Sequence, residues 1–202
     1  MNNFGLYLVM TNPVVGYQAC CEAAVRAGVK MVQLRMKDSP RDEILQTAKD
    51  LVSITKGSET KLIVNDDPCI AAESGADGVH VGQDDMPIIE IRKRFPELSI
   101  VGLSTHNLTQ AIAAEALNPD YIGVGPVYPT PTKKIPDPVL GIECAIEMIK
   151  SVSMPAVAIG GLNLKTLPSV IRAGAQNWAI VRAVCESTSP YDAIRAVQEI
   201  AQ

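Results

Sequence analysis

Short runs of apolar, often β-branched residues alternate along the chain with longer segments whose apolar residues recur at helical spacing. Eight runs bounded by turn residues predict strands, and they cover Leu6–Met10, Met31–Arg35, Lys61–Val64, Gly78–Val81, Ile100–Leu103, Tyr121–Val124, Ala156–Ile159 and Trp178–Val181. Eight amphipathic segments predict helices near residues 17–28, 40–56, 68–75, 87–95, 108–117, 141–151, 164–173 and 190–201. The pattern therefore predicts a strand-then-helix unit that recurs eight times.

This repeated order indicates the fold class. Strands that alternate with helices require right-handed crossovers and a parallel sheet, and eight units in 202 residues leave about 25 residues per unit, which suits a compact closed barrel. Gly28, Gly75 and Gly174 each lie between a helix end and a strand, where glycine permits a left-handed cap. We expect an α/β fold, a single-domain (β/α)8 TIM barrel over residues 1–202, with an open doubly wound sheet as the alternative.

Composition and charge narrow the function classes. Eighteen Lys and Arg residues against 22 Asp and Glu residues give a formal net charge of -4, which indicates no basic surface for nucleic acid. The sequence contains neither an 18-residue apolar run nor a signal-peptide pattern at its start, so we expect a cytoplasmic protein without a membrane partner. Small buried thiols are expected rather than disulfides or a metal cluster, from Cys20, Cys21, Cys69, Cys144 and Cys185.

Polar residues follow several of the expected strands, at the face where barrel enzymes build their sites. Gln33, Arg35 and Lys37 alternate along an extended segment, so they share one side and present an amide and two positive charges. Such a set suits a polyphosphate, because arginine and lysine both bind phosphate oxygens. A solvated strand end is the alternative.

Two carboxylates end the neighbouring strands. Asp66 and Asp85 are suited to hold Mg²⁺ together with a phosphate substrate, because Mg²⁺ prefers one or two carboxylates and keeps several waters. Asp67, which precedes Pro68 at a predicted helix start, is interpreted as a helix cap.

The last two strands predict a second anion site. Gly160-Gly161 and Val181-Arg182 occupy the place where barrels commonly bind a monophosphate through backbone N–H groups, although a tight turn needs the glycines equally. The loop 125–140 carries five prolines and presents Thr130, Thr132 and Lys133 near its tip. We interpret it as a lid that orders over a substrate, with a merely stiff connection as the alternative.

Several of these motifs together resemble thiamine phosphate synthase, in that family's order and over nearly the whole chain. They are Gln33-Leu34-Arg35-Met36-Lys37, Asn65-Asp66, Gly78-Val79-His80-Val81-Gly82-Gln83-Asp84-Asp85, Gly102-Leu103-Ser104-Thr105-His106, Gly123-Val124-Gly125-Pro126, Thr130-Pro131-Thr132-Lys133 and Ala158-Ile159-Gly160-Gly161. The resemblance implies an enzyme that joins 4-amino-2-methyl-5-hydroxymethylpyrimidine diphosphate to 4-methyl-5-(2-phosphoethyl)thiazole, or to its carboxylated form. The products are thiamine phosphate and diphosphate, with Mg²⁺ as cofactor.

The resemblance also implies a role for each matching residue. It assigns the pyrimidine's diphosphate to Gln33, Arg35, Lys37, Asn65 and Lys133, the Mg²⁺ ion to Asp66 and Asp85, the thiazole to Thr130 and Thr132, and the thiazole phosphate to Gly161, Val181 and Arg182. Ser104 lies beside the reacting groups, and Arg35 and Lys133 act with it in catalysis. The diphosphate leaves first, the amino group of the pyrimidine stabilises the methylene cation, and the thiazole nitrogen attacks it.

Two features depart from the family, and two alternatives stay open. The family often carries serine where this chain has Arg182, and arginine or an aromatic residue where it has Asp67. A related thiazole tautomerase uses a histidine where this chain has Pro126, which cannot transfer a proton, so the synthase is preferred. A catalytically silent phosphate-binding barrel is the third hypothesis. The sequence leaves the oligomeric state open, with a homo-oligomer as one alternative. We expect His80 to have a hydrogen-bonded structural role and His106 to cap a helix.

Overall fold

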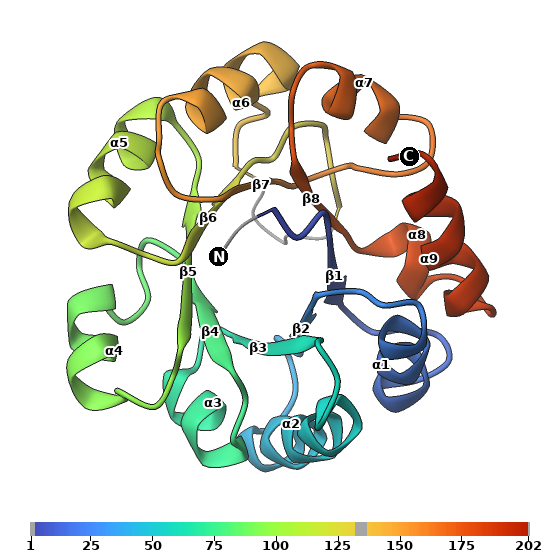
Figure 1. Ribbon diagram of the computed structural model, residues 1–202. Helices are drawn as coiled ribbons and strands as arrows, with labels where there is room; N and C mark the ends of the chain where they lie inside the picture. The colour runs from blue at the N-terminus through green and yellow to red at the C-terminus, as the bar shows by residue number, and fades with distance from the viewer. Residues whose placement is uncertain (1–2, 132–136, 202) are drawn as a thin grey trace.

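A computed structural model describes residues 3–131 and 137–201. Its eight parallel strands pair in chain order and close into a barrel, with the helices in a ring outside (Figure 1). The strands are β1 (Leu6–Met10), β2 (Met31–Leu34), β3 (Lys61–Asn65), β4 (Gly78–Val81), β5 (Ile100–Thr105), β6 (Tyr121–Val124), β7 (Ala156–Ala158) and β8 (Asn177–Ile180). Pairing of β1 with β8 closes the sheet, so the TIM barrel prediction is confirmed and the open sheet is wrong.

The helices lie close to the segments that the hydrophobic pattern predicts, with one addition. They are α1 (Tyr17–Arg26), α2 (Arg41–Thr55), α3 (Pro68–Ser74), α4 (Ile88–Arg94), α5 (Leu108–Leu117), α6 (Gly141–Lys150), α7 (Leu167–Arg172), α8 (Arg182–Cys185) and α9 (Pro190–Glu199). The four-residue helix α8 was not predicted, because a single turn has no apolar periodicity. It follows β8 directly and therefore lies at the carboxyl end of the barrel.

Local sequence accounts for how these helices begin and end. The side chain of Asp67 accepts a hydrogen bond from the amide of Ile70 at 2.9 Å, so the cap interpretation of Asp67 is confirmed. Gly75 ends the same helix in the left-handed conformation, with φ of 78°. The prediction that His106 caps α5 is wrong, because Asn107 accepts the hydrogen bond from the amide of Gln110.

Strand alternation separates two apolar cores. Residues of one parity, such as Leu34, pack outward against the helices, whereas those of the other parity, such as Tyr7 and Ile63, fill the barrel interior. Gln33 has the interior parity and is only 4% exposed. A buried side chain of this polarity requires hydrogen-bond partners inside the barrel.

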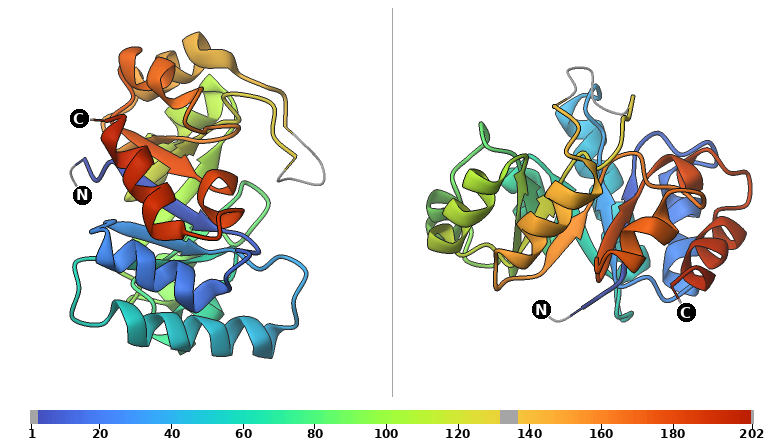
Figure 2. Two further views of the ribbon diagram at one scale, coloured as in Figure 1. Left: turned by 90° about the vertical axis from the view of Figure 1, so that its right-hand side faces the viewer. Right: turned by 90° about the horizontal axis from the view of Figure 1, so that it is seen from above.

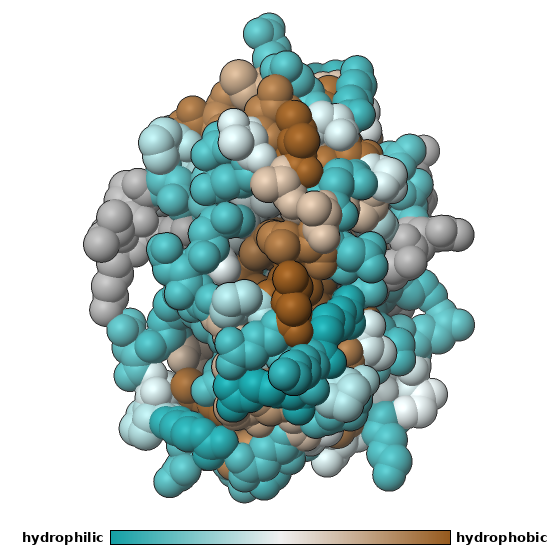
Figure 3. All heavy atoms as spheres, turned by 90° about the vertical axis from the view of Figure 1, so that its left-hand side faces the viewer, coloured by the Kyte–Doolittle hydropathy of each residue, from teal (hydrophilic) through white to brown (hydrophobic). Residues whose placement is uncertain are grey.

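The outer surface is mixed. On the side formed by α4 and α5, polar side chains surround a strip of apolar ones (Figure 3), and the exposed large apolar residues of these helices are Ile89, Leu108, Ile112 and Leu117. None of the described helices is long and apolar enough to cross a membrane. All five cysteines lie in the described part of the chain and none is paired. The prediction of buried thiols is confirmed for Cys20, Cys21 and Cys185, whereas Cys69 is half-buried and the prediction is wrong for the exposed Cys144.

Candidate active site

The end of β2 presents two positive charges at the mouth of the barrel, where the carboxyl ends of the strands meet. The amide of Arg35 donates to the carbonyl of Met10 at 3.0 Å. This bond extends the pairing of β1 and β2 by one residue and fixes the backbone from which the Arg35 side chain extends. Burial lowers the pKa of Arg35, and the negative charge of Asp66 opposes that shift. Lys37 lies beyond the strand with its Nζ 2.8 Å from an Asp66 carboxylate oxygen.

The two carboxylates predicted to bind metal do come together. Asp66 adopts a left-handed conformation, with φ of 65°, and its amide donates to the carbonyl of His80 at 2.8 Å. Asp85 accepts a hydrogen bond from the amide of Gly82 at 2.7 Å. Burial raises the pKa of Asp85, the Gly82 hydrogen bond opposes this, and the neighbouring Asp66 carboxylate raises the pKa further. Two carboxylates that repel each other in this way are suited to share a cation.

This pair suits Mg²⁺ better than a metal held by protein ligands alone. Among the described residues no group of three His, Cys, Asp or Glu side chains could surround an ion. Mg²⁺ keeps several waters and is commonly bound by one or two carboxylates together with substrate phosphates. The donor set of Asp66 and Asp85 therefore fits Mg²⁺ bound with a diphosphate.

Ser104, at the end of β5, is connected to the barrel interior. Its hydroxyl lies 2.8 Å from Nε2 of His80, and Nδ1 of that ring lies 2.9 Å from the hydroxyl of Tyr121. The expected hydrogen-bonded role of His80 is confirmed. On the opposite side of the barrel, Gln33 donates to the hydroxyl of Tyr7 at 2.8 Å.

The ends of β7 and β8 form the second predicted anion site. Gly160 and Gly161 have φ of 99° and 66°, and a Cβ atom on Gly161 would lie 2.6 Å from the Cβ atom of Tyr128. These glycines thus allow the segment after β6 to pack on the turn after β7. Val181 immediately precedes α8, and Arg182 begins that helix with an exposed side chain 3.8 Å from Glu186. A short extra helix after the last strand is typical of barrels that bind phosphate.

The predicted lid leaves the barrel after β6 (Figure 2). Nδ1 of His106 lies 2.7 Å from the carbonyl oxygen of Gly125 and 3.7 Å from a carboxylate oxygen of Asp137, so this ring contacts both described parts of the loop. Thr130 is half-buried in the first part. Thr132 and Lys133 lie outside the described residues, so their predicted roles stay predictions.

One further residue completes the site. Asn65, the last residue of β3, is half-buried beside Asp66, so it lies at the mouth together with the cationic and acidic residues.

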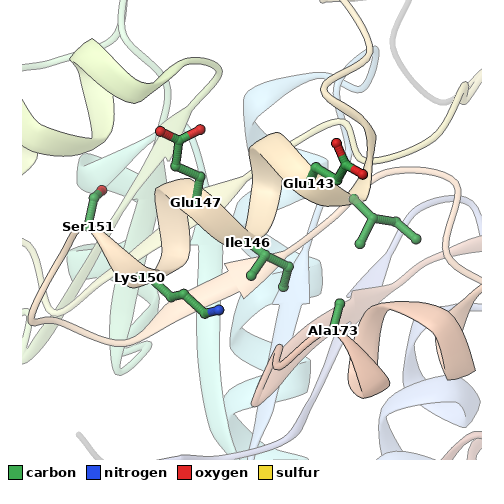
Figure 4. A pocket seen from close by; sticks show the side chains of 7 residues that line it. Glu143, Ile146, Glu147, Lys150, Ser151 and Ala173 are labelled. Atoms are coloured by element: carbon green, nitrogen blue, oxygen red, sulfur yellow. The ribbon is translucent and has the colours of Figure 1, made fainter.

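A surface hollow lies between α6 and α7, away from the mouth, and is lined by residues of these outer helices and their ends (Figure 4). None of its lining residues is a predicted site residue, so the site remains at the mouth.

The chain is similar to known proteins over most of its length. The family model for thiamine monophosphate synthase matches residues 6–184. Thiamine-phosphate synthase from Synechocystis sp. is 43% identical over 188 residues, which cover 93% of this chain and 54% of that relative, so the chain spans about half of the relative's length. Thiamine-phosphate synthase from Roseiflexus sp. is 35% identical over 198 residues, which cover 96% of this chain and 84% of that relative.

Solved structures agree with these relatives. Thiamine phosphate pyrophosphorylase from Pyrococcus furiosus superposes with a TM-score of 0.90 at 30% identity, over 99% of this chain and 96% of that one. A 3-hexulose-6-phosphate synthase, at a TM-score of 0.73 and 17% identity over 98% of this chain and all of the other, shares the fold. The match over most of the chain, in sequence and in structure, shows that it belongs to the thiamine monophosphate synthase family.

Proposed function

We propose that the mouth of the barrel catalyses the thiamine-phosphate synthase reaction, in which a pyrimidine diphosphate and a thiazole phosphate give thiamine phosphate and diphosphate. One observation carries the proposal: Arg35 and Lys37 lie beside the paired carboxylates of Asp66 and Asp85. Cations next to a two-carboxylate metal site suit a leaving diphosphate, whose charge increases as its bond to carbon breaks.

In this mechanism the chain stabilises the leaving group and aligns the reactants. Asp66 and Asp85 would hold Mg²⁺, which would supply positive charge to the leaving diphosphate. Arg35 and Lys37 bind the remaining oxygens, with Asn65 and, from the loop, Lys133 in supporting positions. The bond between the methylene carbon and oxygen breaks, the electron pair leaves with the diphosphate, and the thiazole nitrogen then forms the new carbon–nitrogen bond.

The remaining residues hold the two organic rings in line. Ser104 binds the pyrimidine next to the reacting carbon. Gln33, which the resemblance assigns to the diphosphate, is placed on the pyrimidine instead, because its amide is buried and bonded to Tyr7 inside the barrel. Thr130 and Thr132 contact the thiazole. The thiazole phosphate binds at Gly161, Val181 and Arg182, which follow β7 and β8, whereas the carboxylates follow β3 and β4. Alignment of two bound reactants is worth several kcal/mol, and the loop 125–140 excludes water from the cation.

The test is to incubate purified protein with both substrates, in Mg²⁺ or in EDTA, and to measure thiamine phosphate and diphosphate together. We expect equal amounts of both products, formed only with Mg²⁺. If folded protein gives no product, the proposal is wrong. A thiazole isomerisation assay then separates the tautomerase alternative from a binding barrel without catalysis.

Two wider expectations accompany the proposal. The substrates are small molecules, which agrees with a site built from single side chains at a barrel mouth. Homo-oligomerisation and a cytoplasmic location stay predictions. Light scattering on the purified chain measures the first, and fractionation of cells that express the full gene product measures the second.

A further inference from the structure

A continuous chain of hydrogen bonds crosses the interior of the barrel. Nε2 of Gln33 donates to the Tyr7 hydroxyl at 2.8 Å, which lies 2.8 Å from the Tyr121 hydroxyl. Tyr121 in turn lies 2.9 Å from Nδ1 of His80, and Nε2 of His80 lies 2.8 Å from Oγ of Ser104. The five side chains come from β1, β2, β4, β5 and β6, so the chain connects opposite sides of the mouth.

One direction along this chain gives every hydroxyl proton an acceptor among the five side chains or at the mouth. Because the amide nitrogen of Gln33 can only donate, the Tyr7 oxygen accepts from it and its proton goes to Tyr121. In this direction the Tyr121 proton goes to Nδ1 of His80, which assigns the ring's own proton to Nε2. That proton is donated to Ser104, whose hydroxyl proton is left to point into the mouth.

The surroundings keep both tyrosines protonated and fixed. Tyr7 and Tyr121 are 2% and 0% exposed, and burial raises the pKa of each hydroxyl above its ordinary value. The two rings meet edge to face at 5.6 Å, and Phe4 packs edge to face against both. The two tyrosine hydroxyls are thus shielded from water, which would otherwise compete for their hydrogen bonds.

A glycine makes room for the central hydrogen bond. A Cβ atom on Gly102 would overlap the Tyr121 ring and lie 2.5 Å from Nδ1 of His80. The φ angle of Gly102 is not positive, so space rather than backbone conformation requires glycine there. By contrast, a Cβ atom on Gly123 would lie 3.4 Å from the same imidazole, which is an ordinary contact.

We propose that Tyr7, Tyr121 and His80 are positioning residues that hold Ser104 as a hydrogen-bond donor, and Gln33 in a single amide orientation, toward the pyrimidine substrate. The inference rests on the proposed function for the identity of that substrate. The three residues act through Gln33 and Ser104 and need not touch the substrate. Their role is to orient the Gln33 amide and the Ser104 hydroxyl before the substrate binds.

The first test needs no substrate. The chain contains two histidines, so ¹⁵N-histidine NMR shows two rings, and a His106→Asn variant assigns them. We expect His80 to be neutral with its proton on Nε2. We also expect Tyr121→Phe to change the His80 signals, and the matched variant Tyr191→Phe, on the outer helix α9, to leave them unchanged. A proton on Nδ1 in the unmodified protein, or no change in Tyr121→Phe, overturns the proposal.

The second test separates positioning from stability. We expect Tyr121→Phe to lower kcat about tenfold, the effect of one misplaced hydrogen bond, and to change KM for the pyrimidine diphosphate less than about twofold. Because part of the effect of Tyr121 passes through Ser104, the same change in a Ser104→Ala background should lower kcat by a clearly smaller factor. An equal loss in both backgrounds overturns the proposal. Tyr7→Phe is the substitute variant if Tyr121→Phe does not fold.

Failure of this inference is distinguishable from failure of the proposed function. An unmodified protein that forms no thiamine phosphate contradicts the proposed function, whereas the NMR result on that protein still decides the direction of the hydrogen-bond chain. Active protein with Nε2 of His80 unprotonated contradicts the positioning proposal alone.

Discussion

The two sides of the barrel mouth are built in different ways. The side proposed to bind the diphosphate, called here the diphosphate side, consists of charged side chains at the ends of β2 and β3 and in the loop after β4, namely Arg35, Lys37, Asp66 and Asp85. The side proposed to bind the thiazole phosphate, called here the thiazole-phosphate side, consists of residues 160–161 and 181–182. It depends on glycines in left-handed conformations and on the backbone before α8. Truncation of a charged side chain should therefore impair binding on the first side, whereas addition of a Cβ atom to a glycine should impair binding on the second.

The largest effect is expected from Asp85→Ala. Asp66 and Asp85 are proposed to share Mg²⁺, so loss of one carboxylate should weaken the stabilisation of the leaving diphosphate, and we expect kcat to fall about 100-fold or more. The free energy of unfolding should change by about 1 kcal/mol, since Asp85 makes one hydrogen bond to Gly82. Steady-state kinetics and urea unfolding measure the two quantities.

The matched control for this variant is Asp84→Ala, which removes an exposed neighbouring carboxylate. Its activity should equal that of the unmodified protein. Normal turnover by folded Asp85→Ala protein, or an equal loss in Asp84→Ala, would remove the metal assignment.

A smaller effect is expected from Lys37→Ala on the same side. The side chain is about half exposed and its ion pair with Asp66 adds little stability. A lost charge-assisted contact to the diphosphate should raise KM for the pyrimidine diphosphate roughly 10-fold to 100-fold. Lys30→Ala, equally exposed but paired with Glu59 at the start of β2, is the control and should leave KM unchanged. Equal KM values for the two variants would contradict the role of Lys37.

Adding a methyl group tests the thiazole-phosphate side. Gly161→Ala places a Cβ atom 2.6 Å from Tyr128 Cβ at a positive φ, so we expect about tenfold weaker binding of the thiazole phosphate and a loss of about 1–3 kcal/mol of stability. Gly28→Ala has a similar φ of 72° but meets no atom within 4 Å. The Gly28→Ala variant should lose stability but keep its affinity for the thiazole phosphate. If Gly161→Ala keeps the affinity of the unmodified protein, close backbone approach is not what binds the phosphate.

The smallest effect is expected from Arg182→Ser. The guanidinium is exposed and pairs loosely with Glu186, so its contact with a phosphate should contribute less than about fivefold to KM for the thiazole phosphate. Kinetics with the thiazole phosphate as the varied substrate measure this. An unchanged KM would leave the backbone before α8 as the sole contact at that position.

The sequence predicts the fold well because each strand carries its own signal. Interior and exterior residues alternate, as at Gln33 and Leu34, and helix caps such as Asp67 follow from local chemistry. Helix α8 has no such signal, since four residues cannot show a period. The exposure of Cys144 was not predicted, because the prediction rested on the usual burial of cysteine and not on which face of α6 the residue occupies.

Part of the candidate site could be predicted from the sequence. Because closure of any barrel brings the strand ends together, polar residues after the strands predict that Gln33, Arg35, Asp66 and Asp85 meet at the mouth. The hydrogen bond between Tyr7 and Tyr121 depends on the register of β1 and β6, which lie on different sides of the barrel. An available signal was missed, since both tyrosines have the interior parity of their strands, where a polar atom requires a partner.

The central claim is that the two sides bind different substrates by different means, and calorimetric titration of each substrate alone tests it most directly. In EDTA, we expect binding of the pyrimidine diphosphate to weaken at least about tenfold, because its diphosphate binds together with Mg²⁺ at Asp66 and Asp85. Binding of the thiazole phosphate should change less than about twofold, since backbone groups hold its phosphate. Equal losses for both substrates, or no loss for the pyrimidine diphosphate, would contradict the account.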